Sequence, residues 1–96
     1  MSYKLLIGPQ VRGHQATLGL HHRRAVKLAI RNLAEERGDI MALRDKLAGF
    51  HRLRIGPYRL IFRYAPGRLI QCVYLHERSL VYEIFEAEMG RILGRE

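Results

Sequence analysis

Residues 50–76 decide the fold of this 96-residue chain, and they read FHRLRIGPYRLIFRYAPGRLIQCVYLH. Their alternation of apolar and polar side chains predicts three short antiparallel strands, joined by a Gly-Pro turn and then by a Pro-Gly turn. A two-residue first turn places Arg54 opposite Arg59. Because opposed like charges on neighbouring strands are destabilising, this pair predicts that an anion binds over it.

The two sides of the first two predicted strands differ in chemistry. One side is apolar and aromatic, and we expect it to face the core: Leu53, Ile55, Tyr58, Leu60, Phe62 and Tyr64. The other side, which we call the arginine face, carries Arg52, Arg54, Arg59, Ile61 and Arg63.

The third predicted strand adds aromatic side chains to the arginine face. A Pro-Gly loop of two or four residues places Tyr64 opposite Leu69. The same register predicts three further pairs: Phe62 with Gln71, Ile61 with Cys72, and Arg59 with Tyr74. His76 then lies diagonal to Arg59, about 7–8 Å away. Four side chains from three strands are therefore expected to converge: Arg54, Arg59, Tyr74 and His76.

The segments before this stretch predict one strand and one clear helix. Residues 3–7 form an apolar run closed by Gly-Pro, which indicates a strand. Residues 10–20 give only a weak helical pattern, because glycines interrupt it. Residues 21–37 have apolar side chains at helical spacing and predict a helix that ends at Gly38. Together these elements indicate a single α+β domain over residues 1–96.

Two further helical segments are expected on either side of the strands. Asp39 is expected to cap a short helical turn through Leu43 and Leu47. Ser79 is expected to cap a final helix with an apolar stripe over residues 80–93, and Tyr82 falls on its first turn.

The charge of the chain favours a polyanionic partner. Seventeen Lys plus Arg against nine Asp plus Glu give a formal net charge of +8, with a sequence pI near 10.4. Lysine occurs only at positions 4, 27 and 46, so arginine dominates. Arginine binds phosphate through two parallel hydrogen bonds and stacks on bases, which favours nucleic acid over an acidic protein partner. The two kinds of partner are not exclusive.

Basic residues crowd the start of the helix predicted at residues 21–37, where they oppose the helix dipole. They are His21, His22, Arg23, Arg24 and Lys27. One interpretation is an ordinary solvated helix face. The other is a second patch that contacts phosphate, with Arg23 and Arg24 as RNA-binding residues.

Several classes of protein are excluded by the sequence. No apolar run has the length of a membrane span, and the N-terminus lacks the apolar core of a signal peptide. The single cysteine, Cys72, cannot form an intramolecular disulfide, which fits a reducing cytoplasm. Neither a phosphate-binding glycine loop nor His or Cys residues at metal-ligand spacing are present, so no metal or cofactor is expected.

The arginine face nevertheless has the side chains that metal-independent RNA cleavage requires. In that reaction the ribose 2′-hydroxyl attacks the adjacent phosphate, and the protein stabilises charge and moves protons. Arg54 and Arg59 suit charge stabilisation, and His76 suits proton transfer because histidine titrates near neutral pH. Tyr82 is a candidate proton donor or base-stacking group. On the residues alone, an ordinary solvated sheet face or a binding patch without catalysis is an equal interpretation.

The run from residue 47 to residue 62 carries the pattern L-x-G…R-L-R-I-G-x-Y-R-L-I-F, and HERSLVY follows at residues 76–82. This pattern resembles the RelE/ParE superfamily of bacterial and archaeal toxins, with only residues 10–20 matching loosely. The resemblance implies a small antiparallel sheet of about four strands, with N-terminal helices packed on one face and a C-terminal helix. It also implies a cognate antitoxin that binds and neutralises the toxin.

The resemblance implies a ribosome-dependent endoribonuclease that cuts mRNA in the ribosomal A site. Arg52 and Arg54 match the paired basic residues of the second strand of the family, and Arg59 matches the arginine of its Y-R motif. His76 stands where RelE has another arginine, and Tyr82 matches the C-terminal tyrosine. The expected catalytic residues are Arg54, Arg59, His76 and Tyr82; the expected RNA-binding residues are Arg52, Arg63, Tyr74, Arg78, Arg23 and Arg24.

Three departures from the family pattern leave alternatives open. Pro57 stands at a turn position where an acidic residue is common, and arginines replace the lysines that RelE carries on its strands. His76 in place of arginine either restores a proton carrier or signals altered activity. A ParE-like toxin that inhibits DNA gyrase is the chief alternative, and a catalytically inactive homologue that binds RNA or antitoxin is another.

Overall fold

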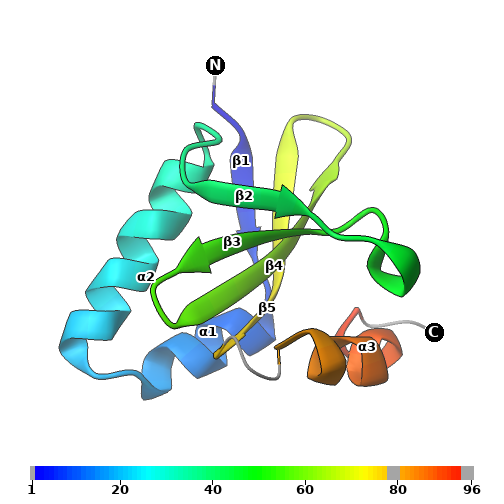
Figure 1. The fold of residues 1–96 in the computed structure, drawn as a ribbon. Helices are drawn as coiled ribbons and strands as arrows, with labels where there is room; N and C mark the ends of the chain where they lie inside the picture. The colour runs from blue at the N-terminus through cyan, green and yellow to red at the C-terminus, as the bar shows by residue number, and fades with distance from the viewer. Residues whose placement is uncertain (1, 78–80, 94–96) are drawn as a thin grey trace.

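The computed structural model describes residues 2–77 and 81–93 (Figure 1). Its elements follow one another along the chain as β1 (Lys4–Ile7), α1 (Pro9–Thr17), α2 (Leu20–Leu33), β2 (Asp39–Ala42), the 3-10 helix η1 (Asp45–Leu47), β3 (His51–Ile55), β4 (Tyr58–Ala65), β5 (Leu69–Glu77) and α3 (Val81–Ile92). Within these described ranges the strands form one five-stranded sheet in the order β1-β5-β4-β3-β2. Strand β1 pairs with β5 in parallel, and the other three pairings are antiparallel.

The predicted α+β class is confirmed, with two N-terminal helices and one C-terminal helix around a mostly antiparallel sheet. The sheet has one strand more than expected, because residues 39–42 form the edge strand β2. The helical turn predicted from Asp39 is therefore wrong, and only the short η1 follows it. Strand β2 pairs with the edge of β3 that β4 leaves open, and this pairing packs Ile40 against the buried core.

The first predicted hairpin is confirmed residue by residue. Ile55 pairs with Tyr58, and Arg54 pairs with Arg59. Gly56 supplies the positive φ, 55°, that the two-residue Gly-Pro turn requires at its first position. The arginine face of β3 and β4 therefore exists as predicted.

The predicted register of the third strand is wrong by one residue next to the turn. Ala65 pairs with Leu69, so the loop has three residues and Tyr64 faces Ile70. An odd loop length shifts the pairing by one relative to the even lengths expected. Phe62 consequently pairs with Cys72 rather than with Gln71.

A second shift, between Ile61 and Phe62, changes the register again. Beyond it Ile61 pairs with Tyr74 and Arg59 pairs with His76, so the predicted pairs of Ile61 with Cys72 and of Arg59 with Tyr74 are also wrong. Two shifts of one residue restore the original alternation of side chains. Tyr74 and His76 therefore lie on the arginine face as expected, with His76 directly opposite Arg59.

Helices cover both faces of the sheet (Figure 1). Helix α2 buries Val26, Ile30 and Leu33 against the apolar face, where Leu53, Leu60 and Phe62 are among the buried strand residues. Helix α3 packs Val81 and Phe85 against Ile61 and Tyr74 on the opposite side, where Leu47 and Phe50 complete a second core. The arginine face is thus partly covered.

The helix boundaries differ modestly from those predicted. Helix α2 ends at Leu33 rather than at residue 37, and Glu36 takes a positive φ of 57°. Helix α1 forms in the weakly patterned segment with Val11 as its one buried residue among those described, which explains the weak apolar signal. Helix α3 lies inside the predicted range 80–93, whereas the proposed Ser79 cap lies outside the described residues. Among the described helices, none combines the length and apolar character that crossing a membrane requires.

Candidate functional site

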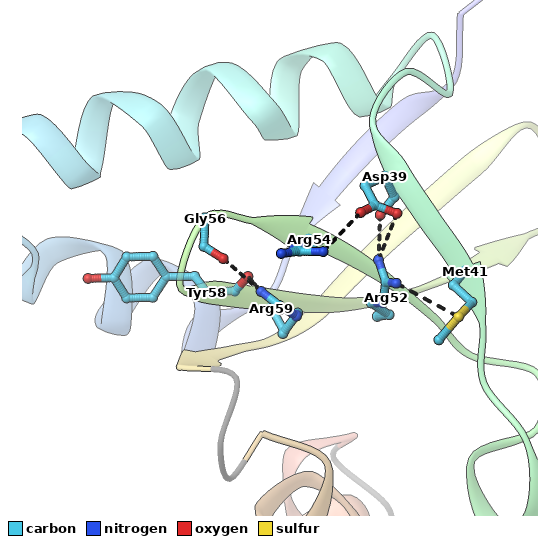
Figure 2. Close-up of polar contacts among 7 residues, drawn as sticks. All are labelled: Asp39, Met41, Arg52, Arg54, Gly56, Tyr58 and Arg59. Atoms are coloured by element: carbon cyan, nitrogen blue, oxygen red, sulfur yellow. Dashed lines mark hydrogen bonds and ion pairs between the residues drawn. The ribbon is translucent and has the colours of Figure 1, made fainter.

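Asp39 on β2 lies between two arginines of β3 (Figure 2). Arg52 donates from Nη1 to the backbone carbonyl of Asp39 at 2.8 Å and to its Oδ1 at 3.1 Å. Nη1 of Arg54 lies 3.9 Å from Oδ2 of the same carboxylate. Since β2 sets Asp39 directly opposite Arg54, the protein itself supplies part of the negative charge expected over the arginine face.

Arg54 and Arg59 are paired in the register, but their side chains bind different partners (Figure 2). Nη1 of Arg59 donates to the carbonyls of Gly56 and Tyr58, each at 2.8 Å. The Arg59 residue is 7% exposed, whereas the Arg54 side chain is 54% exposed. The hairpin thus holds one guanidinium against its own turn and leaves the other at the surface, which relieves the repulsion between opposed like charges.

Tyr74 and His76 extend the arginine face onto β5. Their rings are nearly parallel, 5° apart, with centroids separated by 6.1 Å. Tyr74 is buried against Phe85 of α3 at 5.7 Å. Burial, and next the charge of Glu88, raise the pKa of the Tyr74 hydroxyl above its ordinary value. Tyr74 is therefore a neutral, packed ring at neutral pH, and the half-buried His76 lies beside it.

Tyr82 occupies a different environment from the strand residues. It is half-buried and packs against the core beneath α3. It also lines a hollow of about 340 Å³ whose other walls come from η1 and the first turns of α3, including Lys46, Leu47 and Glu86. The structure therefore places Tyr82 beside η1, next to the covered end of the arginine face.

The expected RNA-binding residues are distributed over several parts of the molecule. Arg63 donates from Nε to Oε1 of Gln71 at 2.7 Å, and its guanidinium lies 5.5 Å from the centre of the Phe50 ring. Arg63 lies four positions after Arg59 along β4, about 13 Å away at strand spacing. Arg23 and Arg24 are exposed on α2, on the opposite side of the sheet. Arg78 lies outside the described residues.

A residue that sequence reasoning missed, His14, also lies at the site. Gln10 of α1 donates from Nε2 to the carbonyl of Leu75 at 2.9 Å and accepts from the Leu75 amide at 2.7 Å. These bonds continue the edge of β5 beyond the end of β1. His14 lies one helical turn after Gln10 on α1. Its ring therefore lies beside the His76 ring, with the two centroids 5.1 Å apart. Asp39 is the second missed residue.

Few other groups in the described structure are suited to chemistry. Burial raises the pKa of the Cys72 thiol to about 12, which keeps it protonated and unreactive. No group of three or more His, Cys, Asp or Glu within residues 2–77 and 81–93 could hold a metal ion. The arginines, histidines and tyrosines of the arginine face remain as the candidate site.

Comparison with known proteins identifies the fold. No family model matches the sequence, and no curated protein matches it. The toxin-antitoxin complex RelBE2 of Mycobacterium tuberculosis matches with a TM-score of 0.72 and 24% identity, over 81% of this chain and 100% of that chain. The RelE-RelB complex of Pyrococcus horikoshii matches with a TM-score of 0.62 and 24% identity, over 82% and 98%. A mutant of the E. coli toxin RelE in the free state matches with a TM-score of 0.55 and 17% identity, over 99% of this chain and 94% of that chain.

Proposed function

The chain has the RelE-like toxin fold, and from that premise we propose that it is the toxin of a type II toxin-antitoxin system and a ribosome-dependent endoribonuclease. The observation that carries the proposal is the arginine face. Arg52, Arg54 and Arg59 lie there together, with His76 directly opposite Arg59. A cleavage of RNA through its 2′-hydroxyl needs these kinds of side chain and no metal.

Arg54 is the phosphate ligand that the geometry favours most. Its side chain is half exposed, and its contact with Asp39 is long, 3.9 Å. An exposed ion pair of this kind contributes only about 0–1 kcal/mol, so a phosphate group displaces it at little cost. In the proposed reaction, Arg54 stabilises the charge that develops on the phosphate oxygens.

Arg59 and Arg52 have supporting roles that fit their contacts. The two turn carbonyls fix the guanidinium of Arg59, so it contributes a positive charge that need not reorganise during the reaction. Arg52 is anchored to Asp39 by two hydrogen bonds and positions the phosphate from the β2 side of the face.

Proton transfer is assigned to His76, because an arginine stays protonated in proteins and is a poor base. Tyr82 donates a proton to the leaving oxygen or stacks on a base from the α3 side. The remaining proposed RNA contacts near this face are Arg63 and Tyr74, and Arg23 and Arg24 form a second phosphate-contacting patch on α2. Arg78, which lies outside the described residues, is also proposed to contact RNA.

The proposed partners are mRNA, the ribosome and a cognate antitoxin. The M. tuberculosis and P. horikoshii structures of this fold are complexes with antitoxins. A net charge of +8 suits both an RNA target and an acidic protein segment. The proposal places the protein in the cytoplasm, where translating ribosomes are found.

The test uses translating ribosomes with a defined mRNA codon in the A site. The ribosome–mRNA complexes are isolated and cross-linked, and EDTA then replaces free magnesium in the assay. The wild-type protein is expected to cut within that codon under these conditions. Arg37→Ala, at an exposed position after α2, is the control and is expected to cut normally. The nuclease proposal would be overturned if wild-type protein at saturating concentration left the mRNA intact but inhibited DNA supercoiling by gyrase. That result would favour the gyrase alternative.

A further inference from the structure

Three stacked rings join helix α1 to the end of β5. The His14 ring lies 5.1 Å from the His76 ring at 26°, and His76 stacks on Tyr74. His14 also contacts Tyr58 edge-on, with centroids 6.3 Å apart. His14 therefore contacts the proposed proton carrier, His76, from helix α1.

One ring nitrogen of each histidine in this stack lacks a hydrogen bond within the described part of the chain. Nε2 of His14 and Nδ1 of His76 are buried and have no partner among the described residues. A catalytic histidine is usually oriented by a carboxylate or carbonyl on its second nitrogen. Here the neighbour that packs on His76 is another imidazole.

The charged and titratable groups around the pair come from four elements. Strand β4 contributes Tyr58 and Arg59, which lies opposite His76, and β5 contributes Tyr74 and Glu77. Helix α2 contributes His22, whose ring contacts Tyr58. Helix α3 contributes Glu88 and Arg91, whose charges act on Tyr74. Burial lowers the pKa of His14 most, the charge of His76 lowers it further, and Glu77 opposes both. The net direction is downward, so the charged form of His14 is disfavoured.

Two imidazolium rings this close repel each other strongly in a partly buried setting. Such groups titrate as a unit, with two separated protonation steps. A proton on either ring therefore disfavours a proton on the other.

We propose that His14 and His76 bind protons as a coupled pair, and that His14 is a positioning residue that sets the pH range in which His76 transfers a proton. The catalytic part of this inference rests on the proposed nuclease function. The coupling itself does not, because it follows from the stacked geometry.

The coupling is tested by NMR titration of the histidine Cε1 protons. In the wild-type protein the His14 signal is expected to titrate below its ordinary value, in a step separate from that of its partner. His76→Gln removes the neighbouring charge, so the pKa of His14 is expected to rise. His21→Gln, at an exposed position whose described ring contact is His22, is the control. An unchanged His14 titration in His76→Gln would overturn the coupling.

The catalytic part is tested by the pH dependence of single-turnover mRNA cutting on the ribosome. His14→Lys places a permanent cation beside His76 and is expected to move the midpoint of the pH–rate profile down by about one unit. His14→Glu places an anion there and is expected to move the midpoint up. His14→Gln keeps a polar planar group without a charge, so its midpoint is expected to lie between those of the Lys and Glu variants. Thermal melts of each variant exclude loss of folding as the cause.

The outcomes separate this inference from the proposed function. Suppose that the wild-type protein cuts mRNA and that the pH–rate profiles of the Lys, Glu and Gln variants superimpose on its own. This result would overturn the role of His14 and leave the nuclease proposal intact. Wild-type protein that cuts no mRNA overturns the nuclease and with it the catalytic role of His14, while the NMR titration still decides whether the pair is coupled. Opposite shifts in the Lys and Glu variants support the inference.

Discussion

The two faces of the sheet are filled in different ways. On the α2 side, side chains such as Leu33, Leu60 and Phe62 are fully buried, and helices and strands close a continuous apolar core. On the arginine face, α3 covers Ile61 and Tyr74, while Arg54 stays half exposed on β3. The difference indicates that the two faces have different roles. The α2 side, which we call the closed face, provides stability, and the partly covered arginine face keeps charges accessible to a ligand.

The largest effect on stability is expected from the closed face. Phe62→Ala removes a fully buried ring and is expected to lower the free energy of unfolding by about 3–5 kcal/mol. Leu28→Ala, at an exposed position of α2, is the control and should change it by less than about 0.5 kcal/mol. Urea denaturation measures both. Equal losses in the two variants would contradict the division between the faces.

The arginine face should show the reverse pattern. Arg54→Ala is expected to lower the rate of ribosome-dependent mRNA cutting by about 10²–10³, because one charge-stabilising contact is lost. Its unfolding free energy should change by no more than about 1 kcal/mol, since the ion pair with Asp39 is exposed. Single-turnover cutting and urea denaturation on the same preparation provide the test. Cutting at the wild-type rate would show that Arg54 is no part of the site.

The stability of the fold should also depend on pH through His14. Its pKa is lowered in the folded protein from an ordinary value of 6.5, so the unfolded chain binds the proton more readily. Stability is therefore expected to fall as the pH drops below about 6.5. His14→Gln should flatten this dependence in thermal melts between acid and neutral pH. A steeper loss of stability in the variant would contradict the burial of a neutral His14.

A small stability effect is expected at Asp39. Asp39→Asn removes the negative charge between Arg52 and Arg54 and should cost about 0–1 kcal/mol of unfolding free energy. Binding of a short RNA, measured by fluorescence anisotropy at fixed salt, should become tighter because the negative charge beside both guanidinium groups is lost. The same measurement on Asp45→Asn, on η1, serves as the control. Weaker RNA binding in Asp39→Asn would indicate that Asp39 holds the arginines in their binding geometry.

The parts of the fold that local patterns specify could be predicted from the sequence. The β3–β4 hairpin has a clear apolar alternation and a two-residue turn, and together they fix its register. The register of β5 could not be predicted, because neither the three-residue loop nor the later shift leaves a distinctive local pattern. Strand β2 depends on the free edge of β3, a tertiary feature that overrides the helical pattern of residues 39–47.

The candidate site divides in the same manner. Arg52, Arg54 and Arg59 could be placed on one face because they belong to the well-specified hairpin. His14 and Asp39 could not be placed, since one depends on the hydrogen bonds of α1 to β5 and the other on the pairing of β2 with β3. The assignments of catalytic and RNA-binding roles remain predictions for all of these residues.

The most direct test of the central claim is cutting of an mRNA that carries a single 2′-deoxynucleotide on the 5′ side of the expected cut. The arginine face is proposed to stabilise attack by that 2′-hydroxyl, so its removal should abolish cutting at the position while the all-ribose mRNA is cut and gains a 2′,3′-cyclic phosphate end. Equal cutting of the two mRNAs would contradict the account.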